Sequence, residues 1–282
     1  MKTRVSLVTV LCIALLSAYV YGQFGQEPAT LDLVKVADDL YVIHNDFVPG
    51  NVTALVTNEG VVLVDDKFEI DIDNVLAQLR KVTNQPVKYV INTHYHGDHS
   101  GGNARLQALG AQVVSSEQAR AKMVEAKQPG VAAFTIEEHG HIYLGGKRAE
   151  LYYFGRAHTD GDIVVLFPDH RVLAAGDMFA YGDATPELID YAGGGSARDW
   201  TGTLDRALQL DFDRVVPGHG VVTTKAEMRT FRDSTLALRN RVREMQAANA
   251  GRAAIEKMLR SEFLWADLHV QLGLDGLLAE LR

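Results

Sequence analysis

The sequence has almost no cysteine: among its 282 residues the only one is Cys12. Cys12 lies in an N-terminal segment that we expect to be removed, so the mature chain would carry no thiol. Such a chain needs no disulfide bond in an oxidising compartment, and no cysteine can serve it as a metal ligand. A disulfide scaffold and a cysteine-based zinc module are therefore excluded.

Long apolar runs are also scarce, because the sequence contains only one. The one such run, Val5–Val20, follows Lys2 and Arg4 and has only 16 residues, and Val20-Tyr21-Gly22 offers tolerable residues for a cleavage site. Because a membrane-spanning helix needs about 20 residues, residues 1–22 are predicted to be a signal peptide rather than an anchor. We expect a periplasmic or secreted protein with no stable membrane association after cleavage.

Positive charge is scarce. The chain has 28 Lys and Arg against 36 Asp and Glu, a net charge of −8, and loss of Lys2 and Arg4 with the signal would make it −10. A protein this acidic cannot compensate the charge of a phosphate backbone. We therefore expect a small-molecule substrate and no nucleic-acid partner.

The remaining residues show the periodicities of strands and helices without any linker between them. We expect a single domain over 31–282, with a helical C-terminal tail from about 226 to 282. Apolar runs predict strands at 53–57, 61–64, 87–91, 112–115, 149–154, 163–167, 172–175 and 215–216. Helical spacing predicts helices at 71–83, 103–109, 117–126, 201–210 and 226–248, and two helical pieces within 251–282.

The strongest chemical signal is the segment His94-Tyr95-His96-Gly97-Asp98-His99, directly after the predicted strand 87–91. Imidazole and carboxylate groups are zinc ligands, and placing four of them within six residues is costly without a cation. Gly97 lets the backbone turn, so that alternate side chains can face two different ions. A surface histidine cluster is the alternative, but the preceding strand and the following Ser-Gly-Gly disfavour it. His158 and His219 also follow short apolar strands, where sites in α/β sheets are built.

The His-x-His-x-Asp-His motif resembles the metallo-β-lactamase superfamily, and further motifs of that family occur in the expected order. They are Asp65 at the end of an apolar strand, Gly155-Arg156-Ala157-His158-Thr159, Ala175-Gly176-Asp177 and Val216-Pro217-Gly218-His219-Gly220. The resemblance covers roughly residues 31–225. It implies an α/β fold of the family type, a four-layer αββα sandwich with the metals at one edge.

The resemblance also implies the ligands and the chemistry. Two zinc ions per chain would be held by seven side chains: His94, His96 and His158 for the first ion, Asp98, His99 and His219 for the second, and Asp177 for both. Asp65 would orient a ligand histidine from outside the ligand set. A metal-bound hydroxide would attack a carbonyl carbon, and Asp98 would act as the catalytic group that orients it and transfers a proton.

The expected function is a zinc-dependent hydrolase of an amide or lactam, a lactone or a thioester, with a β-lactam as a plausible substrate. Cysteine-ligand β-lactamases have Cys where this chain has Asp177 and Arg where it has His99, so the chain differs from that group. Asp177 is similar to the aspartate of glyoxalase II-type hydrolases and lactonases. A lactonase or thioesterase without β-lactamase activity is therefore one alternative, and an iron-dependent persulfide dioxygenase of the same fold is another.

Residues 181–199, which follow Asp177, are predicted to form a loop at the mouth of the site. The segment contains no Lys or Arg between Asp177 and Ser196 to grip a substrate carboxylate, so Tyr181, Tyr191 and Ser196 are the predicted substrate-binding residues. We expect this loop to select the substrate without affecting the metals, with the loop Asp46–Asn51 as the opposing wall.

Overall fold

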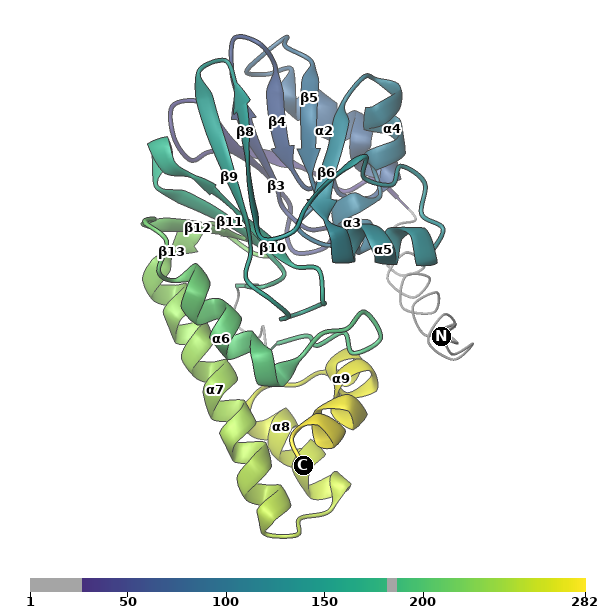
Figure 1. Cartoon of the computed structure of the whole chain (residues 1–282), viewed down its shortest axis with the longest axis vertical. Helices are drawn as coiled ribbons and strands as arrows, with labels where there is room; N and C mark the ends of the chain where they lie inside the picture. Colours follow the sequence, from purple (N-terminus) through teal and green to yellow (C-terminus); the bar gives the residue numbers. More distant parts are fainter. Residues whose placement is uncertain (1–26, 182–186) are drawn as a thin grey trace.

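Two β-sheets face each other and are covered by helices on both outer sides (Figure 1) in the computed structural model, which describes residues 27–181 and 187–282. This arrangement confirms the predicted α/β class and the four-layer αββα sandwich. The predicted signal peptide, residues 1–22 with Cys12, lies outside the described residues, as do residues 182–186 of the predicted mouth loop.

The seven-stranded sheet follows the order of the chain. Its strands β1 to β4 are antiparallel, whereas β4 to β7 run parallel to one another. The strands are β1 (Asp32–Lys35), β2 (Leu40–His44), β3 (Val52–Val56), β4 (Val61–Val64), β5 (Val87–Ile91), β6 (Gln112–Ser116) and β7 (Phe134–Ile136).

The six-stranded sheet has the spatial order β13-β12-β11-β10-β9-β8. Only its β11–β12 pair is parallel. The strands are β8 (His139–Leu144), β9 (Lys147–Tyr153), β10 (Ile163–Phe167), β11 (Val172–Gly176), β12 (Arg214–Pro217) and β13 (Thr223–Thr224).

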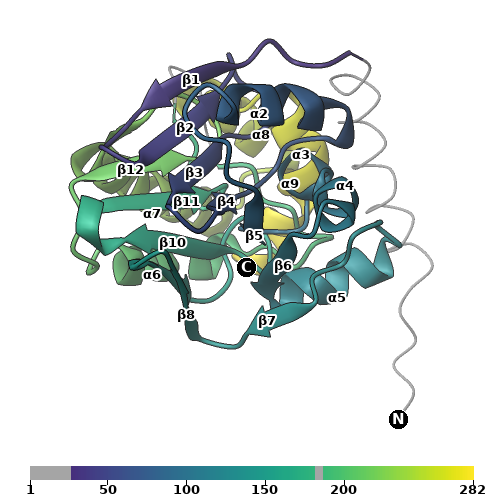
Figure 2. The ribbon, with the colours of Figure 1, turned by 90° about the horizontal axis from the view of Figure 1, so that it is seen from above.

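Helices form the two outer layers. Figure 2 shows the helices of the N-terminal half beside the seven-stranded sheet, and Figure 1 shows those of the C-terminal half below the six-stranded sheet. The first set is η1 (Glu69–Asp71), α2 (Ile72–Leu79), α3 (Gly97–Ser100), α4 (Asn103–Ala108) and α5 (Glu117–Glu125). The second set is α6 (Ala197–Ala207), α7 (Lys225–Ala247), α8 (Arg252–Glu262) and α9 (Asp267–Glu280), and η2 (Pro168–His170) lies between β10 and β11.

The central strands are apolar on both faces because each sheet is packed on both sides. All five residues of β10 are buried. One apolar cluster lies between the sheets and joins Val64 and Ile91 of the first sheet to Val165 and Ala174 of the second. Burial of these continuous runs fixes where the strands end, and the strand ends carry the predicted site residues.

Two features of the local structure differ from the expectation. Helix α6 begins at Ala197 rather than at residue 201, because the Ser196 hydroxyl accepts a hydrogen bond from the backbone of Asp199 and caps the helix there. The sequence analysis assigned no strand to the segment that forms β7 and β8, which are the edge strands of the two sheets. The side chains of β8 alternate between exposed and half-buried positions, and the first two of the three in β7 are exposed, so the apolar run that marks the inner strands is missing.

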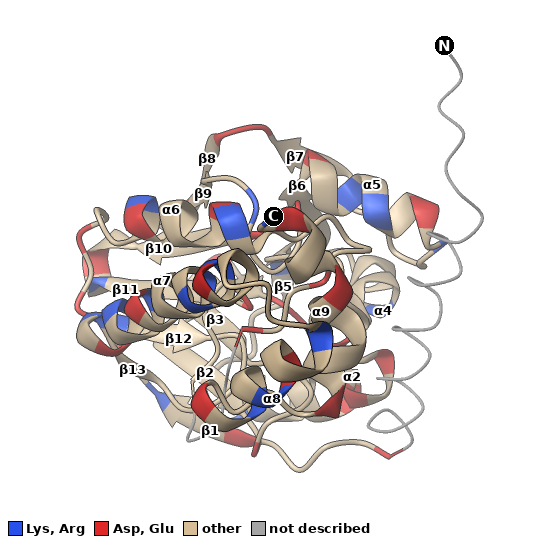
Figure 3. Cartoon of the chain, turned by 90° about the horizontal axis from the view of Figure 1, so that it is seen from below, with Lys and Arg blue, Asp and Glu red and all other residues tan. Residues whose placement is uncertain are grey.

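The C-terminal helices share a core with the six-stranded sheet. One apolar cluster contains Leu173 of β11, Trp200 of α6, Leu238 of α7, Leu259 of α8 and Leu274 of α9. Acidic and basic residues are interspersed on the outer faces of these helices (Figure 3), and several form pairs such as Arg252–Asp275. Among the described residues, no helix combines the length and the apolar character needed to cross a membrane.

This shared core generates a prediction about cooperativity. Leu274→Ala removes a fully buried side chain from α9, and we expect it to lower the free energy of unfolding by about 2–5 kcal/mol in a single transition. Urea denaturation monitored by tryptophan fluorescence and by circular dichroism measures both quantities. Leu109→Ala, at a position that is 57% exposed, is the matched control with little expected effect. Two separate transitions would show that the C-terminal helices form their own domain.

Candidate metal centre

The predicted site residues lie just beyond the ends of five strands. Asp65 follows β4, His94 follows β5 through Asn92 and Thr93, Asp177 follows β11, and His219 follows β12. His158 lies in the loop between β9 and β10. Because these ends meet at one edge of the sandwich, residues more than 150 positions apart in the chain are brought together.

Three histidines form a first group. His94 Nε2 lies 3.1 Å from His96 Nδ1, and His158 Nε2 lies 2.9 Å from the same Nδ1 atom. His94 and His158 are fully buried. The three ring nitrogens converge on one point and could hold a metal ion.

In each of these rings, one nitrogen points away from the group and the other points into it. The hydrogen bond made by the first nitrogen determines whether the second carries a hydrogen or a lone pair. His158 Nδ1 must donate to the carbonyl oxygen of Leu188, at 2.5 Å, and His96 Nε2 must donate to Asp190 Oδ2, at 3.0 Å, because both oxygens only accept. In neutral rings, the two nitrogens that face each other at 2.9 Å are therefore both without hydrogen.

His99, His219 and Asp98 form a second group, in which the outward ring nitrogens again donate hydrogen bonds and the inward ones face each other. His99 Nδ1 donates to Asp65 Oδ2 at 2.9 Å, and His219 Nδ1 donates to the carbonyl oxygen of Phe47 at 2.8 Å. The inward Nε2 atoms of His99 and His219 then face each other at 3.2 Å. Asp98 Oδ2 lies 3.6 Å from His99 Nε2 and 3.5 Å from His219 Nε2, which completes the group.

Asp177 lies between the two groups. Its Oδ1 is 3.2 Å from His99 Nε2, whereas its Oδ2 is 3.3 Å from His219 Nε2 and 3.6 Å from His158 Nε2. Oδ1 is buried without a hydrogen-bond donor. This position suits a carboxylate that is shared between two cations.

Asp65 supports the second group in the way that the sequence analysis expected. It lies at the end of β4 with φ = +63° and accepts hydrogen bonds from the backbone and the hydroxyl of Thr93 at 2.7 and 2.8 Å. The same Oδ2 accepts from His99 Nδ1. Asp65 therefore fixes the tautomer and the orientation of the His99 ring.

The electrostatics of the two groups also fit a cation. Burial lowers the pKa of His158 to about 4, and it holds that of His94 well below its usual value, so both rings are neutral near pH 7. For His99, burial also opposes the charged form, but the carboxylates of Asp177 and Asp98 outweigh it and raise the pKa well above its usual value. The field of these carboxylates therefore favours positive charge at this place. A set of imidazoles and carboxylates with converging lone pairs is the donor set of a zinc centre.

Asp190 is not among the site residues predicted from the sequence. This carboxylate is buried, and its Oδ2 accepts from His96 Nε2 at 3.0 Å and from the Tyr95 hydroxyl at 2.5 Å. Its Oδ1 accepts from the backbone of Gly193 at 2.9 Å. Asp190 therefore orients His96 as Asp65 orients His99. No spacing rule connects it to the histidine motifs, so only its place in the fold identifies it.

The mouth loop is consequently hydrogen-bonded to the first group, which argues against the expectation that changes in the loop leave the metals unaffected. Asp190 contacts His96, and the carbonyl of Leu188 accepts from His158. The hydroxyls of Tyr191 and Ser196, which were predicted to bind substrate, donate to Glu280 of α9 at 2.8 and 2.5 Å.

Tyr181, the third predicted substrate-binding residue, stays beside the second group. Its backbone N–H donates to the carbonyl of His219 at 3.0 Å, and its ring packs near Phe179 with centroids 6.0 Å apart. The glycine at 220 permits this approach, because a Cβ atom there would lie 1.7 Å from the Tyr181 carbonyl oxygen. Tyr181 remains a candidate for substrate contact.

The opposing wall, Asp46–Asn51, is held down by a buried lysine that the sequence analysis also missed. Lys67 Nζ donates to the side-chain oxygen of Asn45 at 2.5 Å and to the carbonyl of Gly50 at 2.7 Å. Phe47 projects from the same loop, is 44% exposed, and lies with its ring centroid 5.1 Å from that of His219. The loop therefore presents an apolar ring beside the metal centre.

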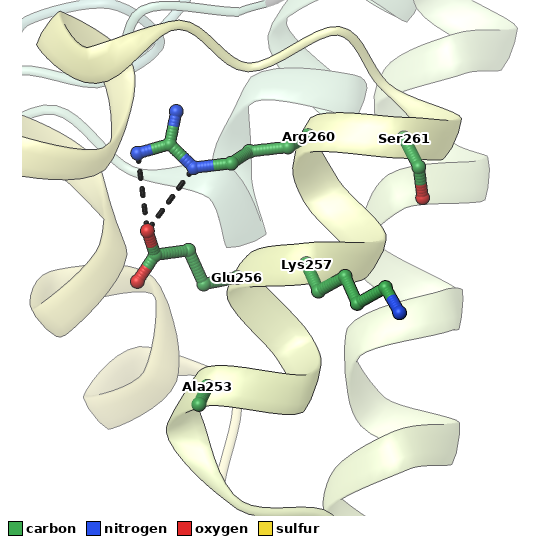
Figure 4. A pocket seen from close by; sticks show the side chains of 5 residues that line it. All are labelled: Ala253, Glu256, Lys257, Arg260 and Ser261. Carbon is green, nitrogen blue, oxygen red and sulfur yellow. Dashed lines mark hydrogen bonds and ion pairs between the residues drawn. The ribbon is translucent and has the colours of Figure 1, made fainter.

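A surface pocket elsewhere lacks the buried imidazole and carboxylate groups of the metal centre. It lies on α8, has a volume of about 550 Å³, and is lined by Ala253, Glu256, Lys257, Arg260 and Ser261 (Figure 4). Arg260 and Glu256 pair with each other at 3.0 Å. All five residues come from one helix, and their charged groups are open to solvent or satisfied locally, so this pocket is not the candidate site.

Comparison with known proteins agrees with the geometry. A family model described as the metallo-beta-lactamase superfamily matches residues 45–219. The chain is 30% identical over 206 residues to "Metallo-beta-lactamase type 2" of Elizabethkingia meningoseptica, covering 70% of this chain and 81% of that protein. It is 27% identical over 192 residues to the protein of the same name from Bacillus cereus, covering 67% and 74%.

Solved structures show the same fold. A metallo-beta-lactamase from Pontibacter korlensis superposes with a TM-score of 0.65 at 23% identity, over 72% of this chain and 99% of that one. The DIM-1 metallo-beta-lactamase gives a TM-score of 0.66 at 20% identity, over 75% and 99%. The chain therefore belongs to the metallo-β-lactamase superfamily, and it is a hydrolase with a metal cofactor.

The buried Lys67 generates a prediction about pH. Burial lowers its pKa from 10.5 to about 7, although the carboxylates of Asp71, Asp98 and Asp65 act in the opposite direction. Between pH 7 and 10 the unfolded chain then binds more protons at this position than the folded chain, so Lys67 makes the free energy of unfolding rise with pH. The slope approaches about 1.4 kcal/mol per pH unit.

Lys67→Met removes this contribution. Urea unfolding of the zinc-free proteins at pH 7, 8 and 9 should show the wild type gaining stability relative to the variant as the pH rises. A difference that is constant with pH would mean that the ammonium group titrates at its ordinary value.

Proposed function

We propose that this protein is a dinuclear zinc hydrolase that opens the ring of β-lactams. His94, His96 and His158 would hold one zinc ion, Asp98, His99 and His219 would hold the second, and Asp177 would contact both. The observation that carries the proposal is the convergence of imidazole lone pairs in two adjacent groups, at 2.9 and 3.2 Å. Seven shared ligands without cysteine fit a catalytic pair better than a closed structural site, which uses four.

When bound, zinc supplies a Lewis acid that polarises the carbonyl and lowers the pKa of water. The side chains of this protein orient the water, transfer its proton and hold the ligand rings in place. The Asp98 carboxylate lies 3.5 Å from His219 Nε2 within the second group, so it could orient the attacking water, accept its proton and return that proton to the departing nitrogen. Asp65 and Asp190 hold the rings of His99 and His96 in their tautomers throughout.

The β-lactam assignment rests on the named relatives and on the shape of the mouth. The relatives from Elizabethkingia meningoseptica and Bacillus cereus carry the name metallo-beta-lactamase. The exposed ring of Phe47 offers apolar contact to a bicyclic substrate beside His219. With Tyr191 and Ser196 bonded to Glu280, Tyr181 is the remaining predicted partner for the substrate carboxylate.

One observation favours a second candidate, the hydrolysis of lactones or thioesters. Asp177 sits between the two groups with contacts to histidines of both, where cysteine-ligand β-lactamases have a cysteine. A bridging carboxylate of this kind is similar to that of glyoxalase II-type enzymes. The two candidates share their metal chemistry and differ only in substrate.

The metal and the substrate are tested together with His96→Ala. We expect the zinc-loaded mature wild type to hold about two zinc equivalents and to hydrolyse at least one of penicillin, cephalosporin and carbapenem. His96→Ala should lose at least one equivalent and most of the activity, because a ligand also contributes binding energy. Metal analysis and initial rates measure both.

His139→Ala, an exposed histidine on β8, is the matched control and should keep both properties. Hydrolysis of acyl lactone or thioester alone would establish the second candidate instead. One equivalent of iron would favour the dioxygenase alternative, and full zinc content in His96→Ala would contradict the ligand assignment.

We also propose that the protein is exported to the periplasm or secreted. The support is the sequence of residues 1–22, with Lys2 and Arg4 before a short apolar run. Mass spectrometry of protein from its native host should show an N-terminus near Gln23. An intact Met1 in a membrane fraction would show an anchor instead.

A further inference from the structure

Helix α9 lies outside residues 45–219, which the family model matches, yet it reaches the loop that touches the metal centre. Glu280, in its last turn, accepts hydrogen bonds from the Tyr191 hydroxyl at 2.8 Å and from the Ser196 hydroxyl at 2.5 Å. It also accepts from the backbone of Arg198 at 3.2 Å, and the Arg198 guanidinium donates to its carbonyl oxygen. One carboxylate therefore ties together two loop positions that lie more than 80 residues earlier in the chain.

The surface of α9 is shaped to receive this loop. Gly276 is one turn before Glu280, and a Cβ atom there would lie 2.3 Å from the ring of Tyr191. The Tyr191 ring therefore rests directly on the helix backbone while its hydroxyl reaches Glu280. Burial and the neighbouring Glu280 carboxylate raise the pKa of Tyr191, so this hydroxyl stays a donor at any physiological pH.

The two tied residues come just after Leu188 and Asp190, which support the first group. Tyr191 directly follows Asp190, and Ser196 is both the N-cap of α6 and hydrogen-bonded through its backbone to Ala157, the residue before His158. Between the two, Gly195 donates its backbone N–H to the carbonyl of Asp190 at 2.8 Å. Tyr191 through the chain, and Ser196 through its neighbour Gly195, are therefore both connected to Asp190.

We propose that Glu280 is a positioning residue of the metal centre. It holds Tyr191, the residue directly after Asp190, and Ser196, which lies five residues further along the same loop. Asp190 in turn keeps the His96 ring turned with Nδ1 toward the other two histidines. The C-terminal helix is thus part of the support of the first metal group.

The inference rests on the proposed ligand set, and it is tested by zinc affinity rather than by activity. Removal of a partner that orients a metal ligand typically lowers metal affinity 10- to 100-fold. For Glu280→Ala we expect about tenfold weaker retention of one of the two zinc equivalents, measured by competition with a chromogenic chelator on the full chain. The second equivalent, held by the other group, should keep its affinity.

Three comparison variants separate positioning from general destabilisation. Asp275→Asn removes an exposed ion pair with Arg252 from the same helix and should leave both affinities unchanged. Tyr191→Phe keeps the ring on Gly276 but removes the hydroxyl, so it should weaken the same equivalent even if Glu280→Ala folds poorly. Glu280→Gln keeps an acceptor and the side-chain length, so it should restore most of the affinity.

A double-mutant cycle identifies the route. If Glu280 acts through Asp190, Glu280→Ala should weaken zinc retention in the wild type but have little further effect in an Asp190→Asn background. Additive losses of affinity in the double mutant, or unchanged affinity in both Glu280→Ala and Tyr191→Phe, would overturn the inference. The proposed function would still stand in that case if the wild type binds two zinc equivalents. A wild type that binds no zinc would instead overturn the proposed function itself.

Discussion

The structure depends on one unfavourable arrangement: ring nitrogens that carry lone pairs face each other in the metal centre. When the rings are neutral, no hydrogen lies between the facing nitrogens of His96 and His158, 2.9 Å apart, or between those of His99 and His219, 3.2 Å apart. Such contacts repel unless a cation lies among them. Everything around the site serves to keep these rings where they are, and the folded chain therefore stores part of the affinity for a metal in its own geometry.

Each histidine ring is held in place by a hydrogen bond from the nitrogen that points away from the metal centre. Asp65, Asp190 and two backbone carbonyls accept the outward N–H groups, so none of the four rings can turn without losing a buried hydrogen bond. The restraints come from strand ends, from the loop before α6 and from the loop 46–51. Lys67 and Glu280 secure those two loops in turn. The rings of the centre are thus held by residues that are themselves held by others. The outermost of these residues, Lys67 and Glu280, belong to the N-terminal and the C-terminal halves of the chain.

The sequence predicted the inner part of this arrangement well for a physical reason. Strand β4 is buried along its whole length, so Val61–Val64 appears as an unbroken apolar run, and β5 ends in the buried pair Val90 and Ile91. The candidate ligand motifs follow these two strands closely. The edge strands β7 and β8 were missed because exposed faces remove that signal. Asp190, Lys67 and Glu280 escaped because their roles come from contacts between distant segments. Lys67 in particular follows two aspartates, a pattern typical of an exposed turn, although it is fully buried.

The absence of sulfur from both ligand groups has a consequence for redox chemistry. A thiolate ligand can be oxidised stepwise to sulfenic, sulfinic and sulfonic acids, and the thiolate that held the metal is then lost. The groups assembled here contain only imidazole and carboxylate side chains, which have no place on that ladder. Peroxide, which oxidises a thiolate, therefore finds no thiolate in either of these groups.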